Sequence, residues 1–275
     1  MDAAIEFLSD LLYGPFFSIA NAIWNACIAA CTGLITTTPE AFSPDAWNYV
    51  RDQLYPWTIG IGVSMMNLFF LIGFCRAATN FKENITLELC IESLIRIVVL
   101  NILLQKGFDL IRMFFRVTSY MAGYVISIED INLYTTEADW GSHLFWWVFG
   151  LGYFIVALVC GIIIILTLYG RYMKLYVSIV FFPLAMPTVL LGRGADASAY
   201  AWGKSFLSNV FEIVVIALVM SIAGMIIRGV SIFEGVSLAG FFDGGLQAIN
   251  SLITIILMTG SVKGASSYLN KSFAL

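Results

Sequence analysis

Charged residues are scarce in this chain. Lys, Arg, Asp and Glu together make up 12% of its 275 residues, about half the share found in ordinary soluble domains. Hydrophobic residues make up 60%, and the mean hydropathy is +0.90. The composition excludes an ordinary soluble globular protein and predicts an integral membrane protein. The net charge of −4 and the scattered 14 Lys and Arg residues leave no basic stripe for a nucleic-acid backbone.

Histidine is nearly absent as well. The single histidine, His143, lies beside Trp146 and Trp147, where an anchoring role at the membrane interface is expected. Cys27 and Cys31 share a helical face, but a zinc site there has no histidine to complete it, so packing is the expected role of the five cysteines. The sequence has no Gly-rich nucleotide loop ending in Lys-Ser/Thr and no metal-ligand cluster. We therefore expect a protein that is not an enzyme and that binds no metal or cofactor.

A cleavable signal peptide is not expected either. The N-terminus, MDAAIEFLSDLLYG, carries acidic residues in place of a basic n-region. From Glu6 to Ile35, apolar residues keep a helical period opposite a polar stripe that includes Asn21 and Asn25. This pattern predicts an amphipathic helix in the membrane interface, and a spanning helix is the alternative because the run is long enough.

Long apolar runs are abundant, and they predict an all-α, polytopic membrane helical bundle with about five to six transmembrane helices. The N-terminal amphipathic helix precedes them. An interfacial helix is expected after the second span, where Asp109, Arg112 and Arg116 form a charged stripe opposite aromatic side chains. The expected spans cover residues 57–74, 84–106, the run that ends at 169, 176–194, 206–227 and, as a crossing or a re-entrant segment, 245–261.

The predicted topology depends on the short basic segment 170–174, GRYMK. If it is a tight connector between the third and fourth spans, Arg171 and Lys174 place it in the cytoplasm. The acidic loop and the N-terminus then lie outside. The predicted divisions are an N-terminal amphipathic segment (1–53), the first two spans with the interfacial helix (54–128), the acidic external loop (129–142), a core helical bundle with a Pro-kinked span (143–262) and a short tail (263–275).

Ionisable residues inside the predicted spans mark candidate sites, because a charge in the membrane is costly unless it is paired or wet. Two groups qualify: Glu88, Glu92 and Arg96 in the second span, and Lys204, Ser208 and Glu212 in the fifth. An ion-relay role and a structural role remain open for both groups. The structural alternatives are a pair between Glu212 and Lys204 near the interface, a pair between Glu92 and Arg96 along the helix, and a cytoplasmic vestibule for the glutamates.

Two prolines interrupt the apolar run YVSIVFFPLAMPTVLLGRG (176–194). Pro183 cannot donate to the carbonyl of Ile179, and Pro187 cannot donate to that of Pro183. A kink is expected, and in lipid the freed carbonyls must face protein or water. A lumen or hinge in a conduit and a simple packing kink both remain open.

Residues 176–220 resemble the core of the TrbL family, polytopic inner-membrane components of conjugative type IV secretion systems. The resemblance is carried by an apolar span with the pair Pro183 and Leu184, a short polar link, Trp202 and a long apolar helix. The match covers roughly residues 57–261, and the chain departs from the family in its short external segment and short tail.

The resemblance implies a homo-oligomeric platform in the bacterial cytoplasmic membrane, for which fivefold symmetry is one expectation. Its partners would be the secretion ATPases and other membrane subunits of the secretion system. A single DNA strand bound to a relaxase would pass through or beside it. Two other functions stay open: a secondary transporter with a relay of intramembrane Glu and Arg residues, or a non-conducting membrane scaffold.

Overall fold

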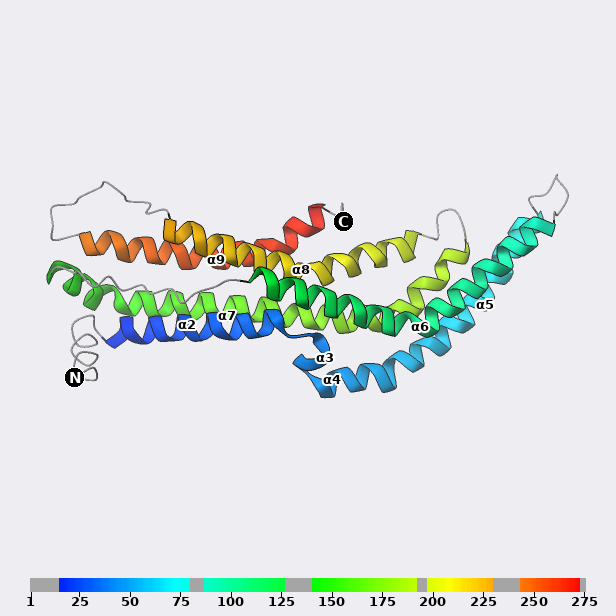
Figure 1. The fold of residues 1–275 in the computed structure, drawn as a ribbon, viewed down its shortest axis with the longest axis horizontal. Coiled ribbons are helices and arrows are strands. Elements are labelled where there is room, and N and C mark those ends of the chain that lie inside the picture. The colour runs from blue at the N-terminus through cyan, green and yellow to red at the C-terminus, as the bar shows by residue number, and fades with distance from the viewer. Residues whose placement is uncertain (1–14, 80–86, 127–139, 192–196, 230–242, 273–275) are drawn as a thin grey trace. The chain divides into compact units, whose positions relative to one another are not determined.

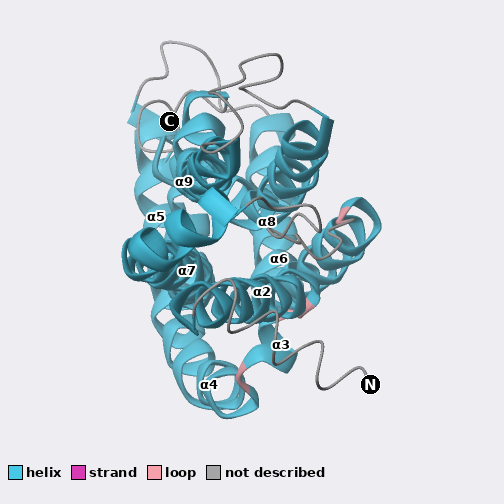
Figure 2. Cartoon of the chain, turned by 90° about the vertical axis from the view of Figure 1, so that its left-hand side faces the viewer, coloured by secondary structure: helices cyan, strands magenta, loops and turns pink. Residues whose placement is uncertain are grey.

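The computed structural model describes residues 15–79, 87–126, 140–191, 197–229 and 243–272, and in these ranges the chain is helical, with no strand (Figures 1 and 2). The all-α prediction is confirmed. The elements are α2 (Pro15–Thr36), α3 (Pro39–Phe42), α4 (Pro44–Tyr49), the π-helix η1 (Val50–Leu54), α5 (Tyr55–Thr79), α6 (Leu87–Val125), α7 (Trp140–Ala185), the 3₁₀-helix η2 (Met186–Leu191), α8 (Ala197–Gly229) and α9 (Asp243–Ser272).

Four of the described helical stretches are long and apolar enough to cross a membrane: Ser18–Thr36, Pro44–Cys75, Trp147–Leu190 and Ser198–Met225. A shorter apolar stretch covers Ile249–Ala265. The chain is therefore a polytopic helical membrane protein. The first stretch lies in α2, so the N-terminal helix has the length and composition of a crossing as well as the expected polar stripe.

The break expected at Pro39 and Pro44 is present. Each proline occupies the first turn of a short helix, and the residue before it caps that helix: Thr38 Oγ1 accepts a hydrogen bond from the Ala41 amide of α3, and Ser43 Oγ accepts one from the Ala46 amide of α4. These caps bond amides of the first turn of each helix, so the chain can leave α2 and start a new helical segment within a few residues.

A third proline, Pro56, lies near the start of α5, yet the chain from Pro44 onward remains helical through η1. The π turn explains this continuity. The Tyr55 amide bonds to the carbonyl of Val50, five residues back, so the register shifts just ahead of the residue that has no amide hydrogen.

Two predicted breaks are absent. The second span and the interfacial helix form the single 39-residue helix α6. The expected connector 170–174 is helical and lies inside α7, so the separation of the third and fourth spans by a turn was wrong. The orientation derived from that connector, with an external N-terminus, loses its basis. The segment holds one glycine and no proline, so its local sequence disfavours a helix by only about 1 kcal/mol.

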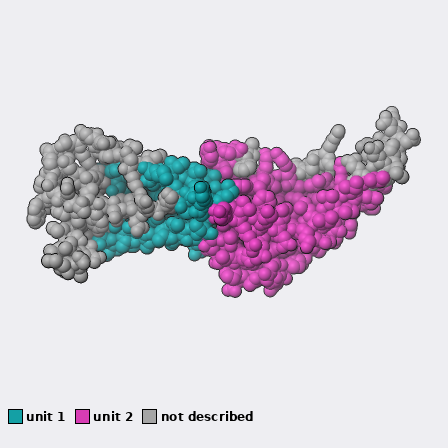
Figure 3. Space-filling model, in the orientation of Figure 1, with its two compact units in different colours: residues 1–36, 121–170, 213–267 teal, residues 37–120, 171–212, 268–275 magenta. Residues whose placement is uncertain are grey.

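The described helices contribute to two compact units, coloured separately in Figure 3. Unit 1 comprises residues 1–36, 121–170 and 213–267. Its core is largely apolar and is built from α2, α6, α7, α8 and α9, with Trp24, Cys31, Leu168, Ala217 and Met258 among its buried side chains. This burial of one face of each helix is the amphipathic pattern expected of packed membrane helices.

Unit 2 comprises residues 37–120, 171–212 and 268–275, and aromatic rings connect its helices. Contacts with centroid separations of 5.0 to 6.3 Å join rings of α4, α5, α6, α7 and α8: Tyr55 with Phe108, Trp47 with Phe108 and Phe115, Phe115 with Phe206, Phe206 with Trp202, and Trp202 with Phe182. Such pairs add stability beyond the area they bury. This series of aromatic contacts therefore holds together the helices that carry the candidate site.

The short helix α3 is anchored to α7 within unit 2. The hydroxyl of Tyr172 donates to the carbonyl of Thr37 (2.9 Å), and the hydroxyl of Tyr176 donates to the carbonyl of Pro39 (2.7 Å). The rings of Phe42 and Tyr172 are stacked with centroids 3.9 Å apart. These contacts satisfy the backbone carbonyls of Thr37 and Pro39 and hold α3 against α7.

Candidate functional site

The two prolines of residues 176–194 lie where α7 changes its helix type. Pro183 is inside α7, and Pro187 is in η2, the 3₁₀ turn that follows. Both are buried. The hydroxyl of Thr188 donates to the carbonyl of Ala185 at 2.7 Å, close to the normal O–H···O distance. A side-chain hydroxyl thus takes up one carbonyl at the point where the α-helical bonding ends.

Helix α5 packs against this irregular stretch through two glycines. A Cβ atom added to Gly62 would overlap the carbonyl oxygen of Pro183, the acceptor that Pro187 leaves without its amide partner. A Cβ added to Gly73 would lie 2.7 Å from the carbonyl oxygen of Leu190. The freed carbonyl therefore faces protein, as expected for a broken helix in a membrane. Burial of this carbonyl against α5 corresponds to a packing kink, one of the two interpretations that the sequence left open.

The family-like residues Leu184 and Trp202 belong to the same region. The indole nitrogen of Trp202 on α8 donates to the carbonyl of Ser178 on α7 at 3.1 Å. Its ring meets Phe182, next to Pro183, with centroids 5.1 Å apart, and stacks on Phe206 at 5.0 Å. Leu184 is half-buried. Trp202 therefore fastens α8 to α7 close to the proline, a contact that sequence reasoning did not predict.

A buried arginine and a buried glutamate lie on the neighbouring helices α7 and α8 of unit 2. The guanidinium of Arg171 on α7 donates from Nε to the carbonyl of Asn209 (3.3 Å) and from Nη2 to the carbonyl of Val210 (3.4 Å), both on α8. It also lies 5.4 Å from the centroid of the Tyr172 ring. Only 2% of Arg171 is exposed, so a base that the sequence assigned to a cytoplasmic connector is fully enclosed.

The nearest opposite charge identified for Arg171 is Glu212 on α8. Glu212 is also 2% exposed, and the two groups interact electrostatically without forming an ion pair in the described structure. The Oε2 atom of Glu212 has no hydrogen-bond partner among the described residues. An uncompensated carboxylate in such a place would be costly. The positive charge of Arg171 reduces that cost without an ion pair, and the Oε2 atom of Glu212 can accept a hydrogen bond.

The ion pair expected between Glu212 and Lys204 is not formed in the described structure. These two residues are eight positions apart on α8, which corresponds to about 12 Å along a helix. The ammonium of Lys204 lies over the ring of Tyr200, 4.9 Å from its centroid. Ser208, between them, is buried at 3% exposure. The face that carries Ser208 and Glu212 thus turns into unit 2.

The other predicted group, on α6, is not brought to this site by any described contact. Arg96 is exposed. The side chains of Glu88 and Glu92 lie outside the described part of the structure, as does His143. Sequence reasoning therefore found Glu212 but missed its partner Arg171. The sequence feature that could have identified Arg171 is an arginine between two apolar runs, in a segment that contains no proline.

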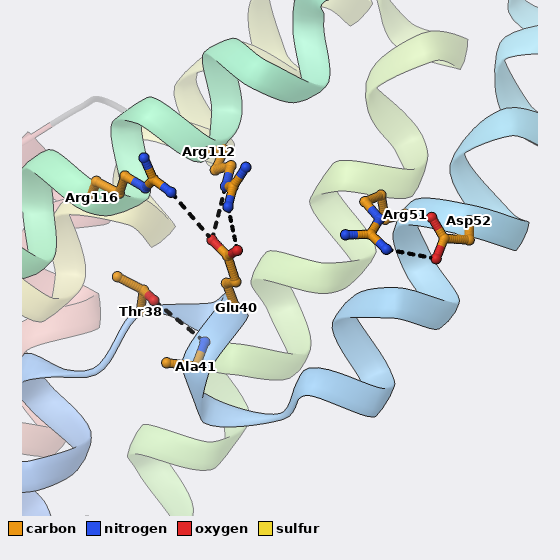
Figure 4. Close-up of polar contacts among 7 residues, drawn as sticks. All are labelled: Thr38, Glu40, Ala41, Arg51, Asp52, Arg112 and Arg116. Atoms are coloured by element: carbon orange, nitrogen blue, oxygen red, sulfur yellow. Dashed lines mark hydrogen bonds and ion pairs between the residues drawn. The ribbon is translucent and has the colours of Figure 1, made fainter.

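A second charged cluster lies at the first turn of α3 (Figure 4). Glu40 accepts two hydrogen bonds from Arg112 on α6, one of them from Nε at 2.8 Å, and Arg116 approaches the same carboxylate at 3.8 Å. About a third of the Glu40 side chain is exposed, so water screens these charges. The charged stripe expected on an interfacial helix therefore serves, in part, to hold α3.

The described residues include no group of three or more His, Cys, Asp or Glu side chains that could hold a metal ion. Cys27 is half-buried and Cys31 is buried in unit 1. Comparison of the chain with models of known families, with curated proteins and with solved structures finds no match.

Proposed function

We propose that this chain is a channel or platform subunit of a conjugative type IV secretion system of the TrbL type, in the bacterial cytoplasmic membrane. The proposal rests on the packing of residues within the region that resembles the TrbL family. Pro183, the neighbouring Phe182 and Trp202 are held together, because Trp202 packs on Phe182 and bonds to Ser178. A contact between motif positions that are distant in sequence supports a shared function for them.

The apolar character of the helices supports membrane placement of the whole subunit. The exposed apolar side chains include Leu68, Leu71, Val98, Ile102 and Leu166, which suits contact with lipid or with further copies of the chain. One chain of this size encloses little volume. A homo-oligomer, with fivefold symmetry as the first expectation, would enclose the path for a DNA strand and its relaxase, next to the secretion ATPases and other membrane subunits.

The test is complementation of a donor strain from which the gene has been deleted. Pro183→Ala and Pro187→Leu should leave membrane insertion intact and abolish DNA transfer, because each restores a helical bond to a freed carbonyl, that of Ile179 or that of Pro183, and so removes part of the break in helical bonding. The matched control is Pro44→Ala, at an exposed first-turn position of α4, and it should transfer normally. Unchanged transfer in both test variants would contradict the role of the turn.

Oligomeric state gives an independent test. Purified, detergent-solubilised protein imaged by electron cryo-microscopy should show a closed ring of copies. A population of single protomers that still supports transfer after reconstitution would contradict the platform.

A secondary transporter is the second candidate, and Glu212 favours it. A buried carboxylate oxygen without a hydrogen-bond partner in the described residues is a place where a proton could bind. Under this alternative, purified protein in liposomes should show proton- or solute-dependent flux that Glu212→Gln removes. Liposomes without flux, together with loss of DNA transfer in the deletion strain, would decide for the secretion subunit.

A further inference from the structure

Two buried polar atoms lie on one face of α2, inside the apolar core of unit 1. Trp24 is fully buried and Asn21 is 9% exposed. Neither the indole nitrogen Nε1 of Trp24 nor the carbonyl oxygen Oδ1 of Asn21 has a hydrogen-bond partner among the residues that the structure describes. Native proteins seldom leave buried donors and acceptors unsatisfied, so these two atoms need an explanation.

The positions of the two atoms favour a common partner. Residues three apart on a helix are neighbours on its surface, with Cβ atoms about 5–6 Å apart. One of the atoms is a donor and the other is an acceptor. A molecule that accepts from Nε1 and donates to Oδ1 satisfies both, and a single water molecule does so with the smallest volume.

The surroundings exclude a charged or bulky ligand. The buried hydrophobic cluster that contains Trp24 includes Ala20, Ile28 and Ala157, together with the hydroxyl-bearing Tyr153. One turn further along α2, Cys27 packs so closely on α7 that a Cβ atom added to Gly161 would lie 2.6 Å from its Sγ. Voids larger than a water molecule are rare in packed interiors, so a bulky ligand is disfavoured here.

We propose that Asn21 and Trp24 bind a structural water molecule within the membrane-spanning part of α2. The water accepts the indole N–H of Trp24 and donates to the amide oxygen of Asn21. This site belongs to unit 1 and does not depend on the proposed secretion function. It accounts for the occurrence of an asparagine and a tryptophan with buried polar atoms in a largely apolar core.

The test uses the full chain in lipid nanodiscs, labelled with ¹⁵N at the tryptophan indoles. Magnetisation transfer between water protons and each indole N–H is measured, and Trp24→Phe assigns the Trp24 signal by its loss. Trp24 should show a cross-peak to water. Trp202, whose indole is bonded to Ser178 at 3.1 Å, should show none, and it serves as the internal reference.

Asn21→Leu should abolish the water cross-peak of Trp24, because the water loses its acceptor. Asn25→Leu, one turn further along the helix at a half-buried position, should leave the cross-peak in place. Absence of a water cross-peak at Trp24 in the wild-type protein overturns the proposal, as does a cross-peak to lipid protons in its place. If Asn21→Leu does not fold, the wild-type measurement decides alone.

Discussion

Arg171 and Glu212 should depend on each other for stability. Both are buried on neighbouring helices of unit 2, and they interact without an ion pair in the described structure. Two charges about 4 Å apart attract by about 4 kcal/mol at an effective dielectric constant of about 20. A longer separation gives less, so we expect a coupling energy of about 2 kcal/mol.

Each single substitution should cost more than the coupling alone. Glu212→Leu leaves the Arg171 guanidinium buried without a counter-charge, and Arg171→Met does the same to the carboxylate, so each should lower the free energy of unfolding by about 3 kcal/mol. The double variant should be destabilised by about 4 kcal/mol, about 2 kcal/mol less than the sum of the two single effects, because it leaves neither charge buried alone. The assay is unfolding of the purified chain in mixed micelles, followed by tryptophan fluorescence and analysed as a double-mutant cycle.

The control for this cycle is Lys174→Met. Lys174 is an exposed base on the same helix, three residues from Arg171, so its loss should change the free energy of unfolding by less than about 0.5 kcal/mol. If the double variant is destabilised by the sum of its two single effects, Arg171 and Glu212 do not interact and the compensation argument is refuted.

Two further predictions concern contacts within unit 2. Gly62→Ala should destabilise the chain by about 2 kcal/mol, because its Cβ would overlap the carbonyl oxygen of Pro183. Gly60→Ala, which enters open space on the same helix, should be stabilising by up to about 1 kcal/mol; equal effects in thermal unfolding would contradict this packing. Glu40→Gln should cost no more than about 1 kcal/mol through its ion pair with Arg112, and the loss should shrink in 1 M salt, measured as a change in Tm.

The all-α fold and several of its boundaries follow from the sequence. Residues 57–74 lie within α5, and the break after α2 occurs at Pro39 and Pro44. These features depend on local chemistry. An apolar run about 20 residues long forms a helix in lipid, and a proline at the first turn with a hydroxyl before it starts a new helix.

The candidate site could be predicted only in part. Glu212 is conspicuous because a carboxylate in an apolar run is rare, and the prolines are conspicuous because they lack an amide. Their partners come from other helices: Arg171 for Glu212, and Gly62 for the carbonyl of Pro183. Such pairings depend on tertiary packing, and a helical period in one segment carries no information about which residue of another segment it meets.

The connector predicted at residues 170–174 shows how a charge can mislead. A reversal between two spans needs residues that favour turns, and this segment offers only Gly170. A basic side chain marks a loop only when it must remain in water, whereas Arg171 donates to carbonyls of α8 and interacts with Glu212. The helix α7 can therefore continue for 46 residues, about 69 Å at 1.5 Å per residue, more than twice one crossing. Arg171 is compensated inside the bundle, so it does not count toward the positive charge of cytoplasmic loops. Of the two bases in this segment, only the exposed Lys174 still counts.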